Sequence, residues 1–461
     1  MWGKETGLPK QDVDVLTATD EELKLYCHRD VEILVHLWNE WEGFLEEHDL
    51  GGTAVTVSGQ AMKAYRYRFM EHAIHLHTNE EVIRLEREAY FGGRTECWWI
   101  GRLPVDRYTL VDVNAQYPYV MGRHAYPFRL AHYYRKVEPE RLASYVRDWG
   151  VIAWVKVRID SPLVPLREEW FNVFPKGEFW TCLSSPDLEL VLARGEITDC
   201  LDVALYETAP LFRAYVKYFT GLRSRYKAEG KHLWVRLVKL MQNSLYGKWG
   251  AKNIEWGWRV NDEGRSPGVE IQGSMNSTES VYSICLGPEI IESCRRTEAI
   301  YSFPAIAAFV TAHARRLLWE YIEMAGAENV FYMDTDSLLV NSAGLARLGS
   351  VLDEDRPGYL SVDYTATSGE IRQPKDYTIG DRRRRKGLTR NARQVSDTDW
   401  IDLQWPKIRG LLWAGQLSGY HNVIVRKQLR RNYRKGRVTP GGRVEPFEYQ
   451  EGLLPSGLLP Y

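Results

Sequence analysis

The sequence feature that most constrains the fold is the stretch VFYMDTDSLLV, in which two short apolar runs flank Asp334, Thr335 and Asp336. Apolar runs of this length on both sides of polar residues predict a buried strand, a tight turn and a second buried strand. Two carboxylates at positions i and i+2 of such a turn repel each other unless a cation lies nearby. A polar hairpin tip without further function is the alternative interpretation, because so short a pattern is common.

A further carboxylate stands at the end of an apolar strand in YTLVDVNAQYPY, where Leu110 and Val111 precede Asp112. Carboxylate oxygens are ligands that Mg²⁺ prefers, and a strand holds such a ligand in a fixed position. Divalent ions held by Asp112 and Asp336 would form a two-metal site, which activates the attacking oxygen and stabilises the leaving oxygen in phosphoryl transfer. For this segment alone, an aspartate that only closes a turn is the alternative.

A third motif, KLMQNSLYG, begins at Lys239 in a stretch with helical periodicity. Residues i, i+4 and i+7 of a helix share a face, so Lys239, Asn243 and Tyr246 align, and Arg236 extends the row. Two cations, an amide and a phenol on one face fit a triphosphate with a base or sugar against the ring. Gly247 is a candidate C-cap that would also let a base pair approach closely. A solvated basic face is the alternative interpretation.

Periodicity and turn signals predict the surrounding elements. Helices are expected from Thr19 to Gly51, over 57–71, over 211–247 with a break near Glu229-Gly230, and over 305–326; strands are expected over 96–100, 108–113 and 151–159; and a hairpin or surface insertion is expected over 252–282. The last 60 residues predict a small β-containing unit.

The three motifs, in this order, resemble motifs A, B and C of family B DNA polymerases, whose patterns are D-x-x-S-L-Y-P, K-x-x-x-N-S-x-Y-G and Y-x-D-T-D-S. The second and third motifs match in full, and the first departs only at Ala115 and Gln116, which are not the predicted metal ligand. The resemblance covers about residues 15–461 and implies an α+β right-hand fold. Its parts would be a palm with an antiparallel sheet, helical fingers, a small β-containing thumb and a helical N-terminal remnant.

Further matches narrow the resemblance to the protein-primed branch of phages, adenoviruses and linear plasmids. Tyr90-Phe91-Gly92-Gly93 is similar to its Y-x-G-G motif, and Lys375-Asp376-Tyr377 is similar to the K-x-Y motif that holds the primer terminus. The basic run that follows could be a nuclear-localisation signal, but its position favours duplex phosphates as its partner. The residues expected to contact DNA are Tyr90, Gly92, Gly93, Lys375, Tyr377, Arg382 and Lys386.

Carried over residue by residue, the resemblance implies that Asp112 and Asp336 are the metal-binding catalytic carboxylates, with Asp334 in support. The implied cofactor is a pair of Mg²⁺ ions, with Mn²⁺ as a substitute. Tyr117 would stack under the incoming sugar and act as a steric gate against ribonucleotides. The other residues expected at the nucleotide are Lys227, Arg236, Lys239, Asn243, Ser244, Tyr246 and Gly247.

The resemblance also implies domain boundaries. These are 1–85 for the C-terminal remnant of a 3′–5′ exonuclease domain and its connector, 86–123 and 301–390 for the palm, 124–208 for an insertion resembling the region that contacts the terminal protein, 209–251 for the fingers, 252–300 for a second insertion linked to strand displacement and processivity, and 391–461 for the thumb.

One fragment resembles the last proofreading exonuclease motif, Y-x-x-x-D, with Tyr26 and Asp30 in the two fixed positions. The residues before Tyr26 hold neither D-x-E nor N-x-x-[FY]-D, the two earlier motifs of that site. A site that lacks most of its ligands should not hold two ions, so we expect no exonuclease activity. A helix facing a missing domain would expose apolar surface, which we expect at Trp38 and Trp41.

The net charge of the 461 residues is −1, which taken alone argues against a nucleic-acid partner. The distribution is uneven, because residues 213–248 hold 9 basic and 1 acidic side chains, residues 381–443 hold 17 and 4, and residues 1–50 hold 4 and 13. The basic segments fall where fingers and thumb are expected. They favour template–primer DNA and dNTPs as partners of part of the surface.

The predicted function is a template-directed DNA polymerase that adds dNTPs to a primer 3′-hydroxyl, with a terminal protein as the expected primer in a phage, virus or plasmid genome. We expect a monomer. We also expect it in the host cytoplasm or nucleoid, because no CxxC pair and no apolar stretch of membrane-spanning length occurs. A catalytically inactive DNA-binding remnant or accessory subunit is one alternative. A metal-dependent nuclease is another, although it would need no triphosphate pocket.

Overall fold

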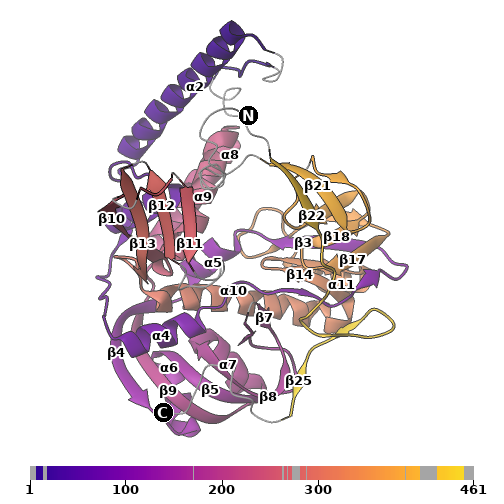
Figure 1. Ribbon diagram of the computed structural model, residues 1–461. Helices are drawn as coiled ribbons and strands as arrows, with labels where there is room; N and C mark the ends of the chain where they lie inside the picture. Colours follow the sequence, from indigo (N-terminus) through magenta and orange to yellow (C-terminus); the bar gives the residue numbers. More distant parts are fainter. Residues whose placement is uncertain are drawn as a thin grey trace.

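The structure is a computed structural model that describes residues 7–13, 18–169, 171–261, 264–266, 268–272, 281–286, 288–389, 391–404 and 423–450. Helices and mostly antiparallel sheets are both present, which confirms the α+β class (Figure 1). In the described part of the chain, every helix is too short or too polar to cross a lipid bilayer.

The central sheet is antiparallel and has the order β1-β14-β15-β3-β16. Its strands are β1 (Thr95–Cys97), β3 (Tyr108–Val113), β14 (Val330–Asp334), β15 (Ser337–Val340) and β16 (Leu360–Ala366). The predicted strand–turn–strand unit is therefore confirmed as the hairpin β14–β15. Strand β3 lies beside that hairpin, with Asp112 opposite Ser337.

Helix α10 (Pro304–Ala325) runs through the middle of the molecule (Figure 1), and its side chains belong to both large apolar cores. Most of its side chains are buried, and many of the buried residues are alanines. Small side chains let four helices approach it closely: α4 (Glu80–Ala89), α5 (Gln116–Arg123), α7 (Ser185–Arg194) and α9 (His232–Trp249). Pro304 in the first turn fits the start of a helix, where its missing N–H costs no hydrogen bond.

Residues 126–209 supply four strands of a second five-stranded sheet, and residues 448–449 supply the fifth. The order of this sheet is β25-β8-β5-β9-β4, and two helices cover it (Figure 1). The elements are β4 (Tyr126–Arg135), α6 (Pro139–Asp148), β5 (Gly150–Ile159), β6 (Leu166–Arg167), β7 (Asn172–Val173), β8 (Lys176–Ser184), α7 (Ser185–Arg194), β9 (Glu196–Ala209) and β25 (Glu448–Tyr449). The predicted strand over 151–159 is confirmed as β5, which is central and mostly buried.

The predicted helical stretch over 211–247 is confirmed as α8 (Arg213–Ala228) and α9 (His232–Trp249), and its break is at Gly230. Gly230 has a φ of +69°, a left-handed backbone conformation that glycine adopts without strain. Both helices pack with α3 (Val57–Ala64), the π-helical turn η1 (Tyr65–Phe69), α4 (Glu80–Ala89) and α5 (Gln116–Arg123) around a shared apolar core.

Helix α2 (Asp20–Glu47) begins as predicted, with a capping box between Thr19 and Glu22. It ends at Glu47, before the predicted Gly51, where His48 leaves helical geometry and its ring contacts the hydroxyls of two tyrosines of α8. The helix projects from the body (Figure 1). Apolar exposure is confirmed at Trp38, which is 51 % exposed. It is wrong at Trp41, which stacks on Trp234 of α9 with ring centroids 6.5 Å apart.

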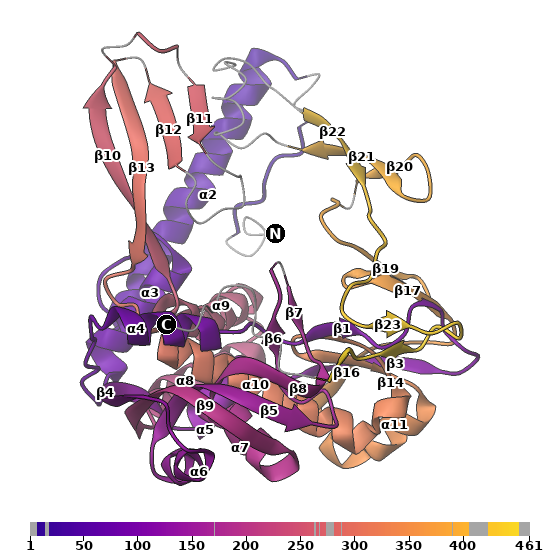
Figure 2. The ribbon, with the colours of Figure 1, turned by 60° about the horizontal axis from the view of Figure 1, so that its bottom comes forward.

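The predicted insertion after α9 is a four-stranded antiparallel sheet with the order β10-β13-β12-β11 that projects from the body (Figure 2). Its strands are β10 (Lys252–Val260), β11 (Gly268–Gln272), β12 (Val281–Leu286) and β13 (Glu289–Glu298).

The C-terminal part of the chain, joined by the short strand β2 from residues 101–102, adds small antiparallel sheets next to the central one (Figure 2). The elements are β2 (Gly101–Arg102), η2 (Ala327–Asn329), α11 (Ser342–Arg347), η3 (Gly349–Val351), β17 (Gly369–Gln373), β18 (Asp376–Ile379), β19 (Arg382–Arg385), β20 (Arg393–Gln394), β21 (Asp399–Gln404), β22 (Val423–Gln428), β23 (Arg437–Val438) and β24 (Val444–Glu445). After β22 the chain returns to the central sheet and ends its described part in β25, on β8. The region predicted as thumb thus holds a separate sheet, β20-β21-β22, and a returning segment.

Candidate active site

Two carboxylates lie close together where the interior strands of the central sheet end. Asp112 is the last but one residue of β3, and Asp336 lies in the turn between β14 and β15. The N–H of Val113 donates to the carbonyl oxygen of Asp336 at 2.7 Å, which fixes the turn against the end of β3. The pairing of β3 with β15 thus brings together two residues that sequence analysis predicted as partners.

The turn is supported from outside by the loop Tyr90–Gly93. Thr335 has a φ of +66°, and its N–H donates to the carbonyl oxygen of Arg94 at 2.7 Å. A Cβ on Gly93 would lie 2.6 Å from Cγ2 of Thr335, so only glycine fits at this close approach. Sequence analysis assigned Gly93 to DNA contacts, whereas its side of the loop packs on the turn that carries Asp336.

A buried ion pair that sequence analysis missed holds the same loop. Arg315 of α10 donates to the carbonyl oxygens of Phe91 and Gly92, both at 3.0 Å, and pairs with Asp187 of α7 at 2.6 Å. Both side chains of the pair are buried. The available sequence signal was an arginine within a helix whose residues are mostly apolar, because buried charges require partners.

The electrostatics of the two carboxylates suit a cation. Burial raises the pKa of Asp112 to about 7, and the charges of Asp336 and Asp363 add to the effect. Burial also raises the pKa of Asp336, and Asp334 adds to it, while Lys239 and Lys375 act in the opposite direction. Each anion is therefore costly without a neutralising partner.

The donor set fits Mg²⁺ or Mn²⁺, which bind carboxylate oxygens and retain waters or substrate oxygens in their other positions. Among the described residues, no group of three or more Asp, Glu, His or Cys side chains gathers around one point.

The carboxylate of Asp334 is engaged by other side chains of the protein. Its Oδ1 lies 3.0 Å from Nζ of Lys375 and accepts from Oγ1 of Thr95 at 3.1 Å. Lys375 has a φ of +62°, and its N–H donates to the hydroxyl of Tyr332 at 3.0 Å. Tyr377 is 7 % exposed and packs on Tyr332. The triplet around Lys375 is thus joined to the strand that leads into the Asp334–Asp336 turn.

Two tyrosines predicted from different motifs stack on each other beside the carboxylates. The rings of Tyr117 and Tyr246 have centroids 4.6 Å apart and an angle of 15° between their planes. Burial is the main cause that raises the pKa of both phenols, and the charge of Asp336 contributes to each. Ala115, with a φ of +49°, starts the helix that carries Tyr117. Burial also raises the pKa of Tyr90 to about 12, with Tyr246 contributing.

Helix α9 presents the predicted polar face toward Asp112 and Asp336. Lys239 is exposed and opposes the raised pKa of both Asp112 and Asp336, so its charge acts at the site. Asn243 is half-buried, and a Cβ on Gly247 would meet no atom within 4 Å, which leaves the face open there. Ser244 differs from its predicted neighbours, because its hydroxyl donates to the carbonyl oxygen of Leu240 at 2.6 Å.

Comparison with known proteins assigns the family. The sequence profile of "DNA polymerase type B, organellar and viral" matches residues 9–331, which include β3 and α9 and end just before Asp334. The chain belongs to the organellar and viral type B DNA polymerases. The family and the branch predicted from the motifs are confirmed, and the assignments of single residues stay predictions.

Two curated relatives agree with this family. The chain is 23 % identical over 342 residues to a DNA polymerase of Kluyveromyces lactis, covering 69 % of this chain and 32 % of the relative. It is 25 % identical over 299 residues to a DNA-directed DNA polymerase of Enterobacteria phage PRD1, covering 62 % of this chain and 49 % of the relative. The chain thus spans less than half the length of both relatives.

A solved structure shows the same fold. Phi29 DNA polymerase complexed with primer-template DNA and incoming nucleotide substrates superimposes with a TM-score of 0.64 and 16 % identity, covering 93 % of this chain and 77 % of that chain. The right-hand type B fold is therefore confirmed.

Other predicted residues of this type B chain have partners of their own. Lys227 lies on α8 and forms an ion pair with Asp355, and Arg236 is exposed on α9. Arg382 pairs with Asp363, and its charge lowers the pKa of Asp112, which places it near the carboxylates. Lys386 is exposed.

The exonuclease-like fragment of this type B chain is also paired. Nζ of Lys10 lies 2.9 Å from Oδ2 of Asp30 and 4.6 Å from the ring centroid of Tyr26. The expected lack of exonuclease activity stays a prediction.

Proposed function

We propose that this chain is a template-directed DNA polymerase that adds dNTPs to a primer 3′-hydroxyl. The observation that carries the proposal is the meeting of Asp112 and Asp336 beside the stacked Tyr117–Tyr246 pair, with the charge of Lys239 acting on both carboxylates. A nuclease needs the two carboxylates, but it needs neither the stacked Tyr117–Tyr246 pair nor Lys239, which would bind a nucleotide triphosphate. Membership of the type B family and the similarity to two DNA polymerases support the same function.

Asp112 and Asp336 would hold divalent cations, which supply charge stabilisation at the phosphate oxygens and activation of the primer hydroxyl. Lys239 would bind the triphosphate and neutralise charge on the departing pyrophosphate. Tyr117 would lie under the sugar, with Tyr246 beside it at the new base pair. Lys375, held between Asp334 and Tyr332, would contact the primer strand. The protein would mainly position the reacting groups.

A primer-extension assay with Mg²⁺ tests this assignment through Asp112→Asn and Asp336→Asn. Each variant should lose at least about 100-fold in rate, because a group that stabilises the transition state is removed. Asp148→Asn, at an exposed aspartate of α6, is the matched control and should extend normally. Extension by Asp336→Asn at near wild-type rate would sink the assignment. A wild-type protein that binds primed DNA but never extends it would favour the inactive accessory subunit.

We propose further that the primer is a hydroxyl group of a terminal protein, and that the folded sheet of residues 124–208 receives that protein. The resemblance to the protein-primed branch supports this. Incubation with labelled dNTP, Mg²⁺ and a candidate terminal protein should give a covalent nucleotide–protein adduct. Extension of DNA primers without any such adduct would argue for ordinary priming. We also propose that the protein works in the reducing cytoplasm of its host, and the free thiols at Cys27, Cys97, Cys182 and Cys200 fit such a compartment.

A further inference from the structure

Asp376 stands in the middle of the triplet Lys375–Tyr377 but serves a different neighbourhood. Lys375 contacts Asp334, and Tyr377 packs on Tyr332. Successive side chains of a strand point to opposite faces, so the carboxylate of Asp376 is directed away from Tyr377. That carboxylate is 0 % exposed. A fully buried carboxylate needs a strong reason to remain charged.

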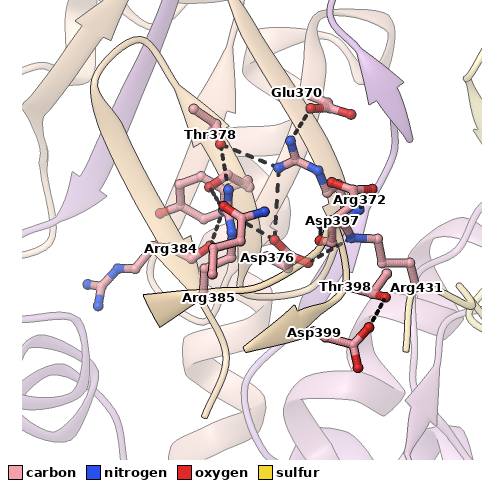
Figure 3. A network of polar contacts seen from close by, with 12 residues as sticks. Glu370, Arg372, Asp376, Thr378, Arg384, Arg385, Asp397, Thr398, Asp399 and Arg431 are labelled. Carbon is pink, nitrogen blue, oxygen red and sulfur yellow. Dashed lines mark hydrogen bonds and ion pairs between the residues drawn. The ribbon is translucent and has the colours of Figure 1, made fainter. Parts of the chain in front are cut away.

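Three guanidinium groups surround this carboxylate (Figure 3). Oδ1 lies 3.2 Å from Nη1 of Arg385 and 3.9 Å from Nη1 of Arg372, and Oδ2 lies 3.5 Å from Nε of Arg431. All three arginine side chains are less than one fifth exposed. Glu370 pairs with Arg372, and Asp397 pairs with Arg431, so the cluster has equal numbers of positive and negative groups. Asp376 is the carboxylate that contacts all three cations.

The three arginines come from two different parts of the molecule. Arg372 and Arg385 lie on β17 and β19, the two strands on either side of Asp376 in its own sheet. Arg431 lies on the segment that returns from the separate sheet β20-β21-β22. Its guanidinium also donates to the carbonyl oxygen of Asp397, in the turn between β20 and β21, at 2.8 Å. Arg431 therefore connects that separate sheet to Asp376.

The returning segment contacts two sheets at alternate residues, first the sheet that contains Asp376 and then the central sheet. Arg431 reaches Asp376, the hydroxyl of Tyr433 accepts from the N–H of Cys97 at 3.0 Å, and Nζ of Lys435 donates to the carbonyl oxygen of Thr95 at 2.9 Å. Strand β1, which contains Cys97 and Thr95, pairs directly with β14 beside Asp334. The segment 431–435 is thus fastened to the framework of the candidate active site.

Loss of the charge of Asp376 would leave three arginines close together in a space with little water. Like charges in such a space repel, and removing one partner of a buried ion pair is costly. Arg372 and Arg385 are fixed in the sheet of Asp376, whereas Arg431 is on the returning segment. We therefore expect the repulsion to move Arg431 outward, together with the separate sheet to which it is bonded.

The separate sheet carries a surface suited to DNA. Exposed or half-buried cationic side chains lie on its strands, at Arg393, Arg426 and Lys427, and just after β22, at Arg430. Such cations fit the phosphate backbone, whose contacts determine affinity more than sequence preference.

We propose that Asp376 is a positioning residue that locks the sheet β20-β21-β22 against the palm, and that this lock sets how long the protein retains primer–template DNA. The inference rests on the proposed function. The proposal concerns the dissociation of DNA and not the binding of dNTP, because the proposed nucleotide pocket lies elsewhere, at Lys239 and Tyr117.

The test compares Asp376→Asn with Asp381→Asn, an exposed aspartate between β18 and β19 that undergoes the same loss of charge. Dissociation of a fluorescent primer–template is measured by competition with unlabelled DNA, and product length per binding event is measured with a DNA trap. Asp376→Asn should release DNA roughly 10-fold faster and make shorter products, with the KM for dNTP changed less than about twofold. Asp381→Asn should behave as wild type, and Asp376→Glu should restore part of the retention.

Arg431→Gln provides an independent test that leaves Asp376 in place. It should also release DNA faster, and adding Asp376→Asn to it should cause little further change, because the two side chains form one interaction. Wild-type dissociation from either folded variant, checked by its melting temperature, would overturn the proposal. A raised KM for dNTP with unchanged dissociation would overturn it as well. If Asp376→Asn fails to fold, Arg431→Gln decides. A wild-type protein that binds DNA without extending it would refute the proposed function, while the dissociation data would still decide the lock.

Discussion

Single residues at the site adopt backbone conformations that their side chains do not favour. Five non-glycine residues of the described chain have a positive φ, and three of them, Ala115, Thr335 and Lys375, lie in the three segments that meet at the carboxylates. A left-handed conformation costs about 1 kcal/mol or more for a residue with a Cβ. Such strain persists where the surrounding structure holds it, which is a common property of functional sites.

Gly93→Ala tests the support of the turn at Thr335. The added Cβ would lie 3.1 Å from Cα of Thr335 as well as against its methyl group, so the backbone must shift. If Asp336 acts as proposed, its displacement by a fraction of an ångström should reduce kcat of primer extension by about 10- to 100-fold. Gly349→Ala is the control, because its Cβ would meet nothing within 4 Å. Unchanged kcat in Gly93→Ala would contradict a supporting role of this loop.

Tyr117→Val tests the steric gate. Without the ring, the pocket should accept the 2′-hydroxyl, and the ratio of kcat/KM for rNTP to that for dNTP should rise about 10-fold or more. Tyr117→Phe keeps the ring stacked on Tyr246 and should keep the wild-type ratio. The two ratios are measured by single-nucleotide extension. A ratio in Tyr117→Val equal to that of the wild type would refute the gate.

At the scale of elements, sequence reasoning identified the four longest helices and the strands that carry the motifs, but it missed elements such as α7 and β9 and did not show how the elements meet. The faces of α9 and the strand nature of β3 followed from local periodicity. The stacking of Tyr117 on Tyr246 depends on the packing of α5 against α9, which no local pattern encodes. The ion pair of Arg315 with Asp187 joins α10 to α7 across 128 positions of sequence and was missed for the same reason.

The contact between the end of α5 and α10 makes stability depend on pH. His124 and His313 stack with ring centroids 3.8 Å apart, and burial lowers the pKa of His124 to about 4 and that of His313 well below its usual range. Because folding favours the neutral rings, their contribution is complete above about pH 6.5 and is lost as pH falls toward 4. His124→Phe should flatten this part of the profile by on the order of 1–2 kcal/mol.

The measurement is the melting temperature between pH 7.5 and pH 4.5. His132→Phe, at an exposed histidine of β4, should follow the wild-type profile and serves as the control. Identical profiles for wild type and His124→Phe would show that the stacked pair does not titrate as described.

At the scale of the whole molecule, a net charge of −1 conceals a polar arrangement. Sequence counts placed positive charge at 213–248 and 381–443, and the structure assigns these segments to helices α8 and α9 and to the sheets from β19 onward. The return of the chain after β22 was not predicted. It depends on long-range pairing, in which β25 joins β8 and Tyr433 bonds to Cys97, and short segments such as Glu448–Tyr449 carry no strand signal of their own.

The most direct test of the central claim is single-nucleotide incorporation on four primed templates that differ only in the templating base. With Mg²⁺ and each dNTP supplied separately, the wild-type protein should add the complementary nucleotide in every case, and Asp336→Asn should add none. Addition of the same nucleotide regardless of the template, or DNA binding without any addition, would contradict the assignment of a template-directed polymerase centred on Asp112 and Asp336.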